Sequence, residues 1–247
     1  SNSIVIATLG IFSILAIIGT IYVSIPNPQT SSLRHEAFNK GHRCSILKNA
    51  RQSFLETITE LDLSSCNLVS LPKEIRTCAA LQKLDISSNP LLETLHSELA
   101  KCTKLEILFS SQNTGMTTLP TVLGSMTSLT RLGWRSGSLT SILEPEEIPP
   151  NVVHLILTNN HIRELHNPAV FDRLRHVRKL MLSHNQITSL PSEGVVKMVE
   201  LELLRLAGNQ LTTIPDELWA LPRLTWLTIS GNPGLGLPAL EQRVPTI

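Results

Sequence analysis

The chain has 247 residues and a formal net charge of +1, with 21 Lys and Arg against 20 Asp and Glu. This balance argues against a basic duplex-binding domain, and a hydrophobic content of 42% argues against a disordered chain. Aromatic residues make up only 4%, so stacking platforms for bases or sugars are scarce. Four cysteines are too few for a disulfide scaffold.

The first apolar segment runs from Ile4 to Ile25 without a charged residue. A helix of about 22 residues is roughly 33 Å long, which is enough to cross a bilayer. Pro26 and Pro28 would end it. The alternatives are a buried core helix, unusual at this length, and a signal peptide, which needs a basic leader and a shorter apolar stretch. We therefore predict a single transmembrane helix within residues 1–25.

The charges that follow this segment indicate its orientation. Arg34, Lys40 and Arg43 come after it, offset by Glu36, whereas no charged side chain precedes it. The positive-inside tendency then places the rest of the chain on a cytosolic, matrix or stromal side, as for an organelle inner or thylakoid membrane. Neither end of the later repeats carries a cysteine cluster, and no N-x-S/T acceptor occurs, which favours the same reducing side.

Residues 26–57 are expected to form a linker and an N-terminal cap. Pro26 to Ser32 has the composition of an extended connector. Between Cys44 and Thr57, apolar residues recur at roughly helical spacing: Ile46, Leu47, Phe54 and Leu55. A stack of repeats needs such a cover, because its first repeat would otherwise expose hydrophobic core to water.

The rest of the chain repeats one pattern eight times. The template L-x-x-L-x-L-x-x-N/C-x-L begins at Ile58, Leu81, Leu105, Leu129, Val152, Val177, Leu201 and Leu224. Successive copies are 23 to 25 residues apart. A period this steady predicts a solenoid over residues 58–235, followed by a C-terminal tail at 236–247.

This pattern resembles the leucine-rich repeat family. Several copies continue with a Leu-Pro or Ile-Pro step, as in the intracellular subclass with a 23–24-residue period and LPxxI/L after the Asn: Leu71-Pro72, Leu119-Pro120, Leu190-Pro191 and Ile214-Pro215. The resemblance implies an α/β solenoid fold. Each L-x-L pair would form a short strand, the strands would stack into one curved parallel sheet, and the segments between them would return along the convex side.

Four features of single repeats lead to specific expectations. The Asn of each copy is expected to bond neighbouring backbone groups in a ladder, with Cys66 taking the first position and Gly137 leaving a gap. Trp134 occupies a core Leu position. Three prolines in residues 144–150 predict an irregular acidic loop on the convex side. This loop is either a solvated turn or a docking site for a basic partner.

No motif for catalysis, nucleotide binding or metal binding is present in the sequence. His161 and His166 lack the spacing of a helical zinc pair, and no C-x-x-C occurs. Cys78 and Cys102 occupy equivalent convex positions, and we expect two buried thiols rather than a disulfide. We therefore predict no enzyme, cofactor or metal, and neither a small-molecule substrate nor a nucleic acid as partner.

The outward strand positions can be read from the repeat, because side chains alternate along a strand. They predict a protein-binding surface on the concave face, formed by Ile107, Phe109, Ile156, Met181, Leu203, Arg205 and Trp226. The alternative is a scatter of single exposed apolar residues, which needs no functional explanation.

The leading hypothesis is a membrane-anchored module that binds other protein subunits. It would be a scaffold or an accessory subunit of a larger membrane-embedded complex, such as a respiratory or photosynthetic assembly. The alternative is a receptor-like or signalling adaptor that binds a peptide or protein ligand. A receptor outside the cell predicts capping disulfides and glycosylation.

Overall fold

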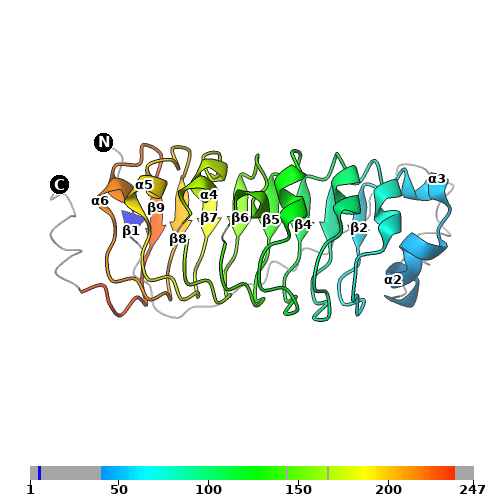
Figure 1. Ribbon diagram of the computed structural model, residues 1–247, viewed down its shortest axis with the longest axis horizontal. Helices are drawn as coiled ribbons and strands as arrows, with labels where there is room; N and C mark the ends of the chain where they lie inside the picture. Colours follow the sequence, from blue (N-terminus) through cyan, green and yellow to red (C-terminus); the bar gives the residue numbers. More distant parts are fainter. Residues whose placement is uncertain (1–4, 7–39, 143, 166, 237–247) are drawn as a thin grey trace.

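A computed structural model describes residues 5–6, 40–142, 144–165 and 167–236 of the chain. Its strands form one parallel sheet in the order β1-β9-β8-β7-β6-β5-β4-β3-β2 (Figure 1). The strands are β1 (Val5–Ile6), β2 (Glu60–Asp62), β3 (Lys83–Asp85), β4 (Ile107–Phe109), β5 (Arg131–Gly133), β6 (His154–Ile156), β7 (Lys179–Met181), β8 (Leu203–Arg205) and β9 (Trp226–Thr228). From β2 to β9 each strand comes from one copy of the repeat.

Each of these repeat strands places its central Leu in the core. In β2, Leu61 is buried between the outward-facing Glu60 and Asp62, and Leu63 continues the alternation into the interior. The next strand pairs at equal positions, so that Leu61 lies beside Leu84. The same register holds along the sheet, and the core is therefore a continuous stack of leucines.

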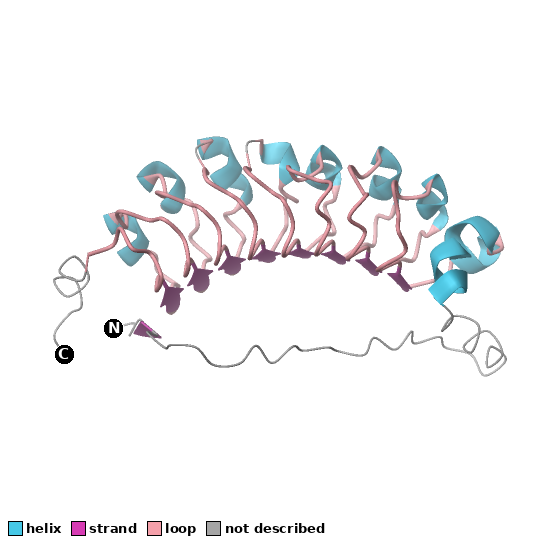
Figure 2. Cartoon of the chain, turned by 90° about the horizontal axis from the view of Figure 1, so that it is seen from below, coloured by secondary structure: helices cyan, strands magenta, loops and turns pink. Residues whose placement is uncertain are grey.

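The return segments form short helical turns. They are η2 (Lys73–Thr77), η3 (Ser97–Lys101), η4 (Thr121–Ser125), η5 (Pro145–Glu147), α4 (Pro168–Arg173), α5 (Ser192–Val195) and α6 (Asp216–Trp219). Figure 2 shows the strands along the inner edge of an arc and these turns along its outer edge. Strands pack about 4.8 Å apart whereas a helix is about 10 Å wide, so the stack bends with the sheet on the concave side.

A left-handed residue precedes each ladder position. The φ angle lies between 53° and 70° at Ser65, Ser88, Gln112, Ser136, Asn159, His184, Gly208 and Gly231. This conformation turns the chain after each strand and directs the next side chain into the interior.

The buried asparagines form the predicted ladder. Asn209 is typical: its Nδ2 donates to the carbonyl oxygens of Leu182 and Leu206 at 3.0 and 2.9 Å, and its Oδ1 accepts the Ile187 N–H at 3.1 Å. Because these partners belong to two successive repeats, each Asn joins its own repeat to the preceding one. Gly137 contributes no side chain, so the expected gap lies between Asn113 and Asn160.

The N-terminal cap is covalently attached by one disulfide, although the sequence shows no cysteine cluster at either end of the repeats. It consists of α2 (Lys40–Asn49) and α3 (Gln52–Leu55), which bury Leu47 and Leu55 against the first repeat. Cys44 on α2 forms a disulfide with Cys66, with a Cα–Cα distance of 5.2 Å.

The disulfide also corrects the role predicted for Cys66. Its sulfur does not replace an Asn side chain in the ladder, because it is bonded to Cys44. Instead, the backbone N–H groups of Cys66 and Leu68 donate to Asn89 Oδ1 at 2.9 and 3.0 Å. An ion pair between Arg43 and Asp62 adds a second connection between α2 and the sheet.

The proline-rich segment is more regular than expected. It contains the 3-10 turn η5, which Pro145 begins at a position where its missing N–H costs nothing. Glu147 is buried, so this carboxylate does not belong to a solvated acidic loop. The prediction of an irregular loop was therefore wrong for residues 145–147.

Trp134 is fully buried, as its place in the repeat predicts. In the preceding repeat the same position holds Ser110, whose hydroxyl accepts a hydrogen bond from Asn113 Nδ2 at 2.6 Å. A small residue beside a large one keeps the interior filled.

The transmembrane prediction falls almost entirely outside the described residues. The two residues of it that the structure describes form β1, which pairs in parallel with β9, where a helix was expected. No helix in the described part of the chain is long and apolar enough to cross a membrane.

Candidate protein-binding surface

Two rows of side chains line the concave face of the sheet. The first row contains Glu60, Lys83, Ile107, Arg131, His154, Lys179, Leu203 and Trp226. The second row contains Asp62, Asp85, Phe109, Gly133, Ile156, Met181, Arg205 and Thr228. Neighbours within a row are about 4.8 Å apart, the spacing between paired strands.

The structure places all seven predicted contact residues in these two rows. In the second row, Phe109, Gly133, Ile156 and Met181 are consecutive, and we call these four residues the apolar strip. The Phe109 ring lies against Gly133, where a Cβ would come within 2.7 Å of ring atom Cδ1. Glycine therefore leaves the space that lets the ring lie flat on the sheet.

Leu203 and Trp226 form a second apolar pair, adjacent in the first row. Trp226 is 38% exposed, so part of its indole is accessible to a partner. An exposed indole next to Leu203 and Arg205 is a typical anchor in protein interfaces.

The charges on this face are divided between its two ends. Acidic side chains lie on β2 and β3, where Lys83 Nζ is 3.7 Å from Glu60 Oε2 and Arg43 pairs with Asp62. The basic side chains of Arg131, Lys179 and Arg205 lie on β5, β7 and β8.

His154 lies between two of these cations, with Arg131 on one side and Lys179 on the other. Burial lowers the pKa of His154 below its ordinary value, and the positive charges of Lys179, Arg131 and Arg178 lower it further. Glu202 acts in the opposite direction, but more weakly. The imidazole is therefore neutral at pH 7.

Sequence reasoning placed these basic residues outward but did not include Arg131, His154 or Lys179 in the site. Their alignment can be read from the sequence, because the three residues hold the same position in consecutive repeats. It is a pattern of basic residues, which a criterion based on apolar residues does not detect.

The remaining candidates for chemistry are structural. Cys78 and Cys102 are buried free thiols, as expected, and burial raises their pKa values to about 11 and about 12. Both side chains stay protonated and unreactive at neutral pH. His161 is exposed, whereas His166 lies outside the described residues. In the described ranges, no three His, Cys, Asp or Glu residues are grouped to hold a metal ion.

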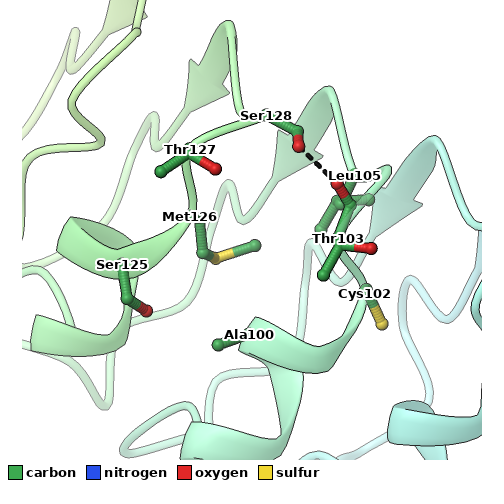
Figure 3. Close-up of a pocket in the computed structure, with 8 residues that line it drawn as sticks. All are labelled: Ala100, Cys102, Thr103, Leu105, Ser125, Met126, Thr127 and Ser128. Atoms are coloured by element: carbon green, nitrogen blue, oxygen red, sulfur yellow. Dashed lines mark hydrogen bonds between the residues drawn. The ribbon is translucent and has the colours of Figure 1, made fainter.

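A cavity of about 30 Å³ lies on the convex side between η3 and η4 (Figure 3). Ala100, Cys102 and Met126 line it, and Ser128 Oγ donates a hydrogen bond to the Thr103 carbonyl oxygen at its edge. This volume accommodates a water molecule or two and is far below that of an organic ligand site.

Comparisons with known proteins identify sequence relatives that match part of the chain. Chaoptin of Drosophila melanogaster is 29% identical over 73% of this chain, and podocan-like protein 1 of Mus musculus is 32% identical over 68%. The chain spans only 11% and 29% of the lengths of these two relatives. A solved leucine-rich repeat protein of Leptospira interrogans is 24% identical, with a TM-score of 0.49, over 76% of this chain and 57% of the other.

Two family profiles, both described as leucine rich repeat, match the chain. One matches residues 150–211 and 175–233, and the other matches residues 57–78 and 80–102. Together the matched ranges include about half of the chain and coincide with copies of the repeat that form the sheet. The chain belongs to the leucine-rich repeat family.

Proposed function

We propose that this solenoid is a membrane-anchored, non-catalytic module that binds another protein on its concave face, as a scaffold or accessory subunit of a larger membrane complex. The observation that carries the binding function is the apolar strip, which lies on the sheet face beside Arg131 and Lys179, two cations without an ion pair among the described residues. The partly exposed side chains of Phe109, Ile156 and Met181 form a contact surface that a protein partner would remove from water.

The anchor rests on the composition of Ile4–Ile25, which has the length and apolar character of a membrane span. Its test is extraction of native membranes with alkaline carbonate. The full chain should stay in the pellet, and a chain that begins at Pro26 should appear in the supernatant. Release of both chains would contradict the anchor.

The disulfide favours a receptor-like role as the second candidate. Disulfides such as Cys44–Cys66 persist in oxidising compartments. This observation opposes the cytosolic, matrix or stromal side that the flanking charges indicate, and it supports a lumenal or extracellular side. Protease treatment of sealed vesicles distinguishes the two, because only a solenoid outside the vesicle is digested.

The binding function is tested by substitution on the two faces of the solenoid. Met181 lies in the apolar strip, whereas Val196 follows α5 on the convex side and is 49% exposed. After mild-detergent extraction and native-gel separation, the wild type and Val196→Glu should migrate with partner proteins identified by mass spectrometry. Met181→Glu should migrate alone.

Two results of this experiment would contradict the proposal. Migration of the wild type alone would show that no stable complex forms. Retention of the complex by Met181→Glu and its loss with Val196→Glu would place the contact on the convex side.

A further inference from the structure

The basic residues on β5, β7 and β8 differ from Lys83 on β3, which has a counter-ion in Glu60. Arg131, Lys179 and Arg205 make no ion pair with any residue that the structure describes. Three other charged side chains in the same rows are paired, since Glu60 pairs with Lys83 and Asp62 with Arg43. The excess positive charge is therefore confined to β5, β7 and β8.

The spacing of these cations suits a peptide chain. Arg131 and Lys179 hold equal positions two strands apart, which corresponds to about 10 Å. In the polyproline II conformation, which has three residues per turn and a rise of about 3.1 Å, carboxylate side chains three positions apart point to the same side and lie about 9 Å apart. Neutral His154 between them adds no charge that would demand a third anionic group.

The second row of side chains on the concave face determines which apolar groups the partner must carry. The side chains of Ile156 and Met181 stand beside His154 and Lys179, on the same strands. A ligand that pairs with the cations is thus held over apolar surface. A long polyanion would not fit equally well, because it would run on toward the acidic side chain of Asp85 on β3.

We propose that the concave face from β5 to β8 binds an acidic peptide segment of a protein partner, with carboxylates at Arg131, Lys179 and Arg205 and apolar side chains on the apolar strip. This inference rests on the proposed protein-binding function and adds the charge and character of the bound segment. The pairing gives selectivity, since a basic segment would meet unpaired like charges.

The test uses the full chain and a fluorescent peptide that repeats Glu-Leu-Ser, with binding measured by fluorescence anisotropy at low ionic strength. The double variant Arg131→Gln/Lys179→Gln should bind this peptide about 5- to 10-fold more weakly, because each exposed ion pair contributes about 0.2–1 kcal/mol. Added salt should weaken wild-type binding, since it screens the same pairs.

The matched control variant is Lys73→Gln/Lys101→Gln, which removes two exposed cations from η2 and η3 on the convex side. It should bind the peptide within about 2-fold of the wild type. A peptide with Gln in place of Glu should bind the wild type at least as weakly as the acidic peptide binds the concave double variant, which keeps Arg205. Circular dichroism should show that both double variants are folded.

Several outcomes would overturn the inference. These are no binding of the acidic peptide, equal binding of the Gln peptide, or equal losses in the two double variants. Binding of a DNA duplex through Arg131 and Lys179 as tightly as the acidic peptide would identify a general polyanion site instead. The native-gel experiment with Met181→Glu does not depend on ligand charge, so it tests the proposed function separately.

Discussion

The ladder asparagines are the residues on which the solenoid depends most directly. Asn209 bonds three backbone groups in two repeats, and its side chain is buried. Asn209→Ala would leave the Ile187 N–H and two carbonyl groups without these partners. We expect the free energy of unfolding in urea to fall by about 2–4 kcal/mol, since an unsatisfied buried polar group costs about 1–3 kcal/mol.

The adjacent residue provides the control for this prediction. Gln210 is exposed, and only its backbone bonds the preceding repeat, through a hydrogen bond to the Ile187 carbonyl. Gln210→Ala should change the unfolding free energy by less than about 0.5 kcal/mol. Equal effects of the two substitutions would show that the ladder contributes little to stability.

Gly208 illustrates a backbone requirement rather than a hydrogen bond. Its φ is 69°, and a Cβ there would lie 2.6 Å from His184 Nδ1. Gly208→Ala should lower the unfolding free energy by about 1 kcal/mol, because the left-handed cost of about 1–2 kcal/mol is partly offset by a stiffer unfolded chain. Ser65→Ala is the control, since Ser65 already has a Cβ at φ 55° and should tolerate Ala with little change. Equal losses would contradict this explanation.

His154 makes stability depend on pH. Its pKa is lowered in the folded protein by burial and by three nearby cations, so at mildly acidic pH the unfolded chain binds a proton more readily. The stability that neutral His154 confers is complete above its unfolded pKa, about 6.5, and is lost as the pH falls through the lower folded pKa. Urea titrations should show that His154→Gln flattens this decline.

The reference for the His154 prediction is the difference in unfolding free energy between the wild type and His154→Gln at pH 8. There the imidazole is neutral in both the folded and the unfolded state, so proton binding does not contribute to the difference between variant and wild type. A decline on acidification that is as steep in His154→Gln as in the wild type would assign the pH dependence to other groups.

Among the elements, the cap depends on its disulfide. Cys44 and Cys66 are separated by 22 positions, and closing a loop of this size stabilises a fold by about 3 kcal/mol in the chain-entropy model. Cys44→Ser/Cys66→Ser should lower the unfolding free energy by about this amount. Hydrogen exchange should accelerate first in α2, because Leu47 and the Arg43–Asp62 ion pair would then be its remaining anchors.

A reducing agent provides the control for the cap prediction. Dithiothreitol should destabilise the wild type toward the double variant and leave the double variant unchanged, since Cys78 and Cys102 are already free thiols. A double variant as stable as the wild type would show that packing alone holds the cap.

The elements also show why sequence reasoning succeeded in one part and failed in another. The strands follow from local spacing, because each L-x-L pair fixes which residues face inward, and equal periods fix the register. That reasoning placed Phe109, Met181 and Trp226 correctly on the concave face. The cap disulfide depends instead on where α2 lies against the sheet, and no spacing within the chain gives that position.

Some features of the concave site likewise follow from the sequence repeat, whereas others depend on how side chains pack. The outward rows could be read from the repeat, and so could the alignment of Arg131, His154 and Lys179. Two features depend on three-dimensional contacts and cannot be read from the repeat. The Phe109 ring lies over Gly133, and Lys83 pairs with Glu60 whereas Arg131 and Lys179 have no ion pair among the described residues.

The whole molecule behaves as a one-dimensional stack, in which each repeat contacts mainly its neighbours. Its weakest link should therefore lie where a connection between repeats is missing. In the C-terminal half of the ladder, the residue two positions after an Asn donates its N–H to the next Asn, as Ile162 does to Asn185 and Ile187 to Asn209. Gly115 holds this position after Asn113. The next ladder residue is Gly137, which has no side-chain oxygen to accept the Gly115 N–H.

Hydrogen exchange of single amides tests whether this gap weakens the stack. The Gly115 amide should exchange at least about fivefold faster than the Ile187 amide, because Gly115 is exposed and has no ladder acceptor, and a hydrogen bond contributes about 1 kcal/mol. Amides of the repeats on both sides of Gly137 should open at a lower free energy than those between Asn185 and Asn232. Uniform protection along the solenoid would instead show that leucine packing, including the buried Trp134, couples these repeats without the ladder.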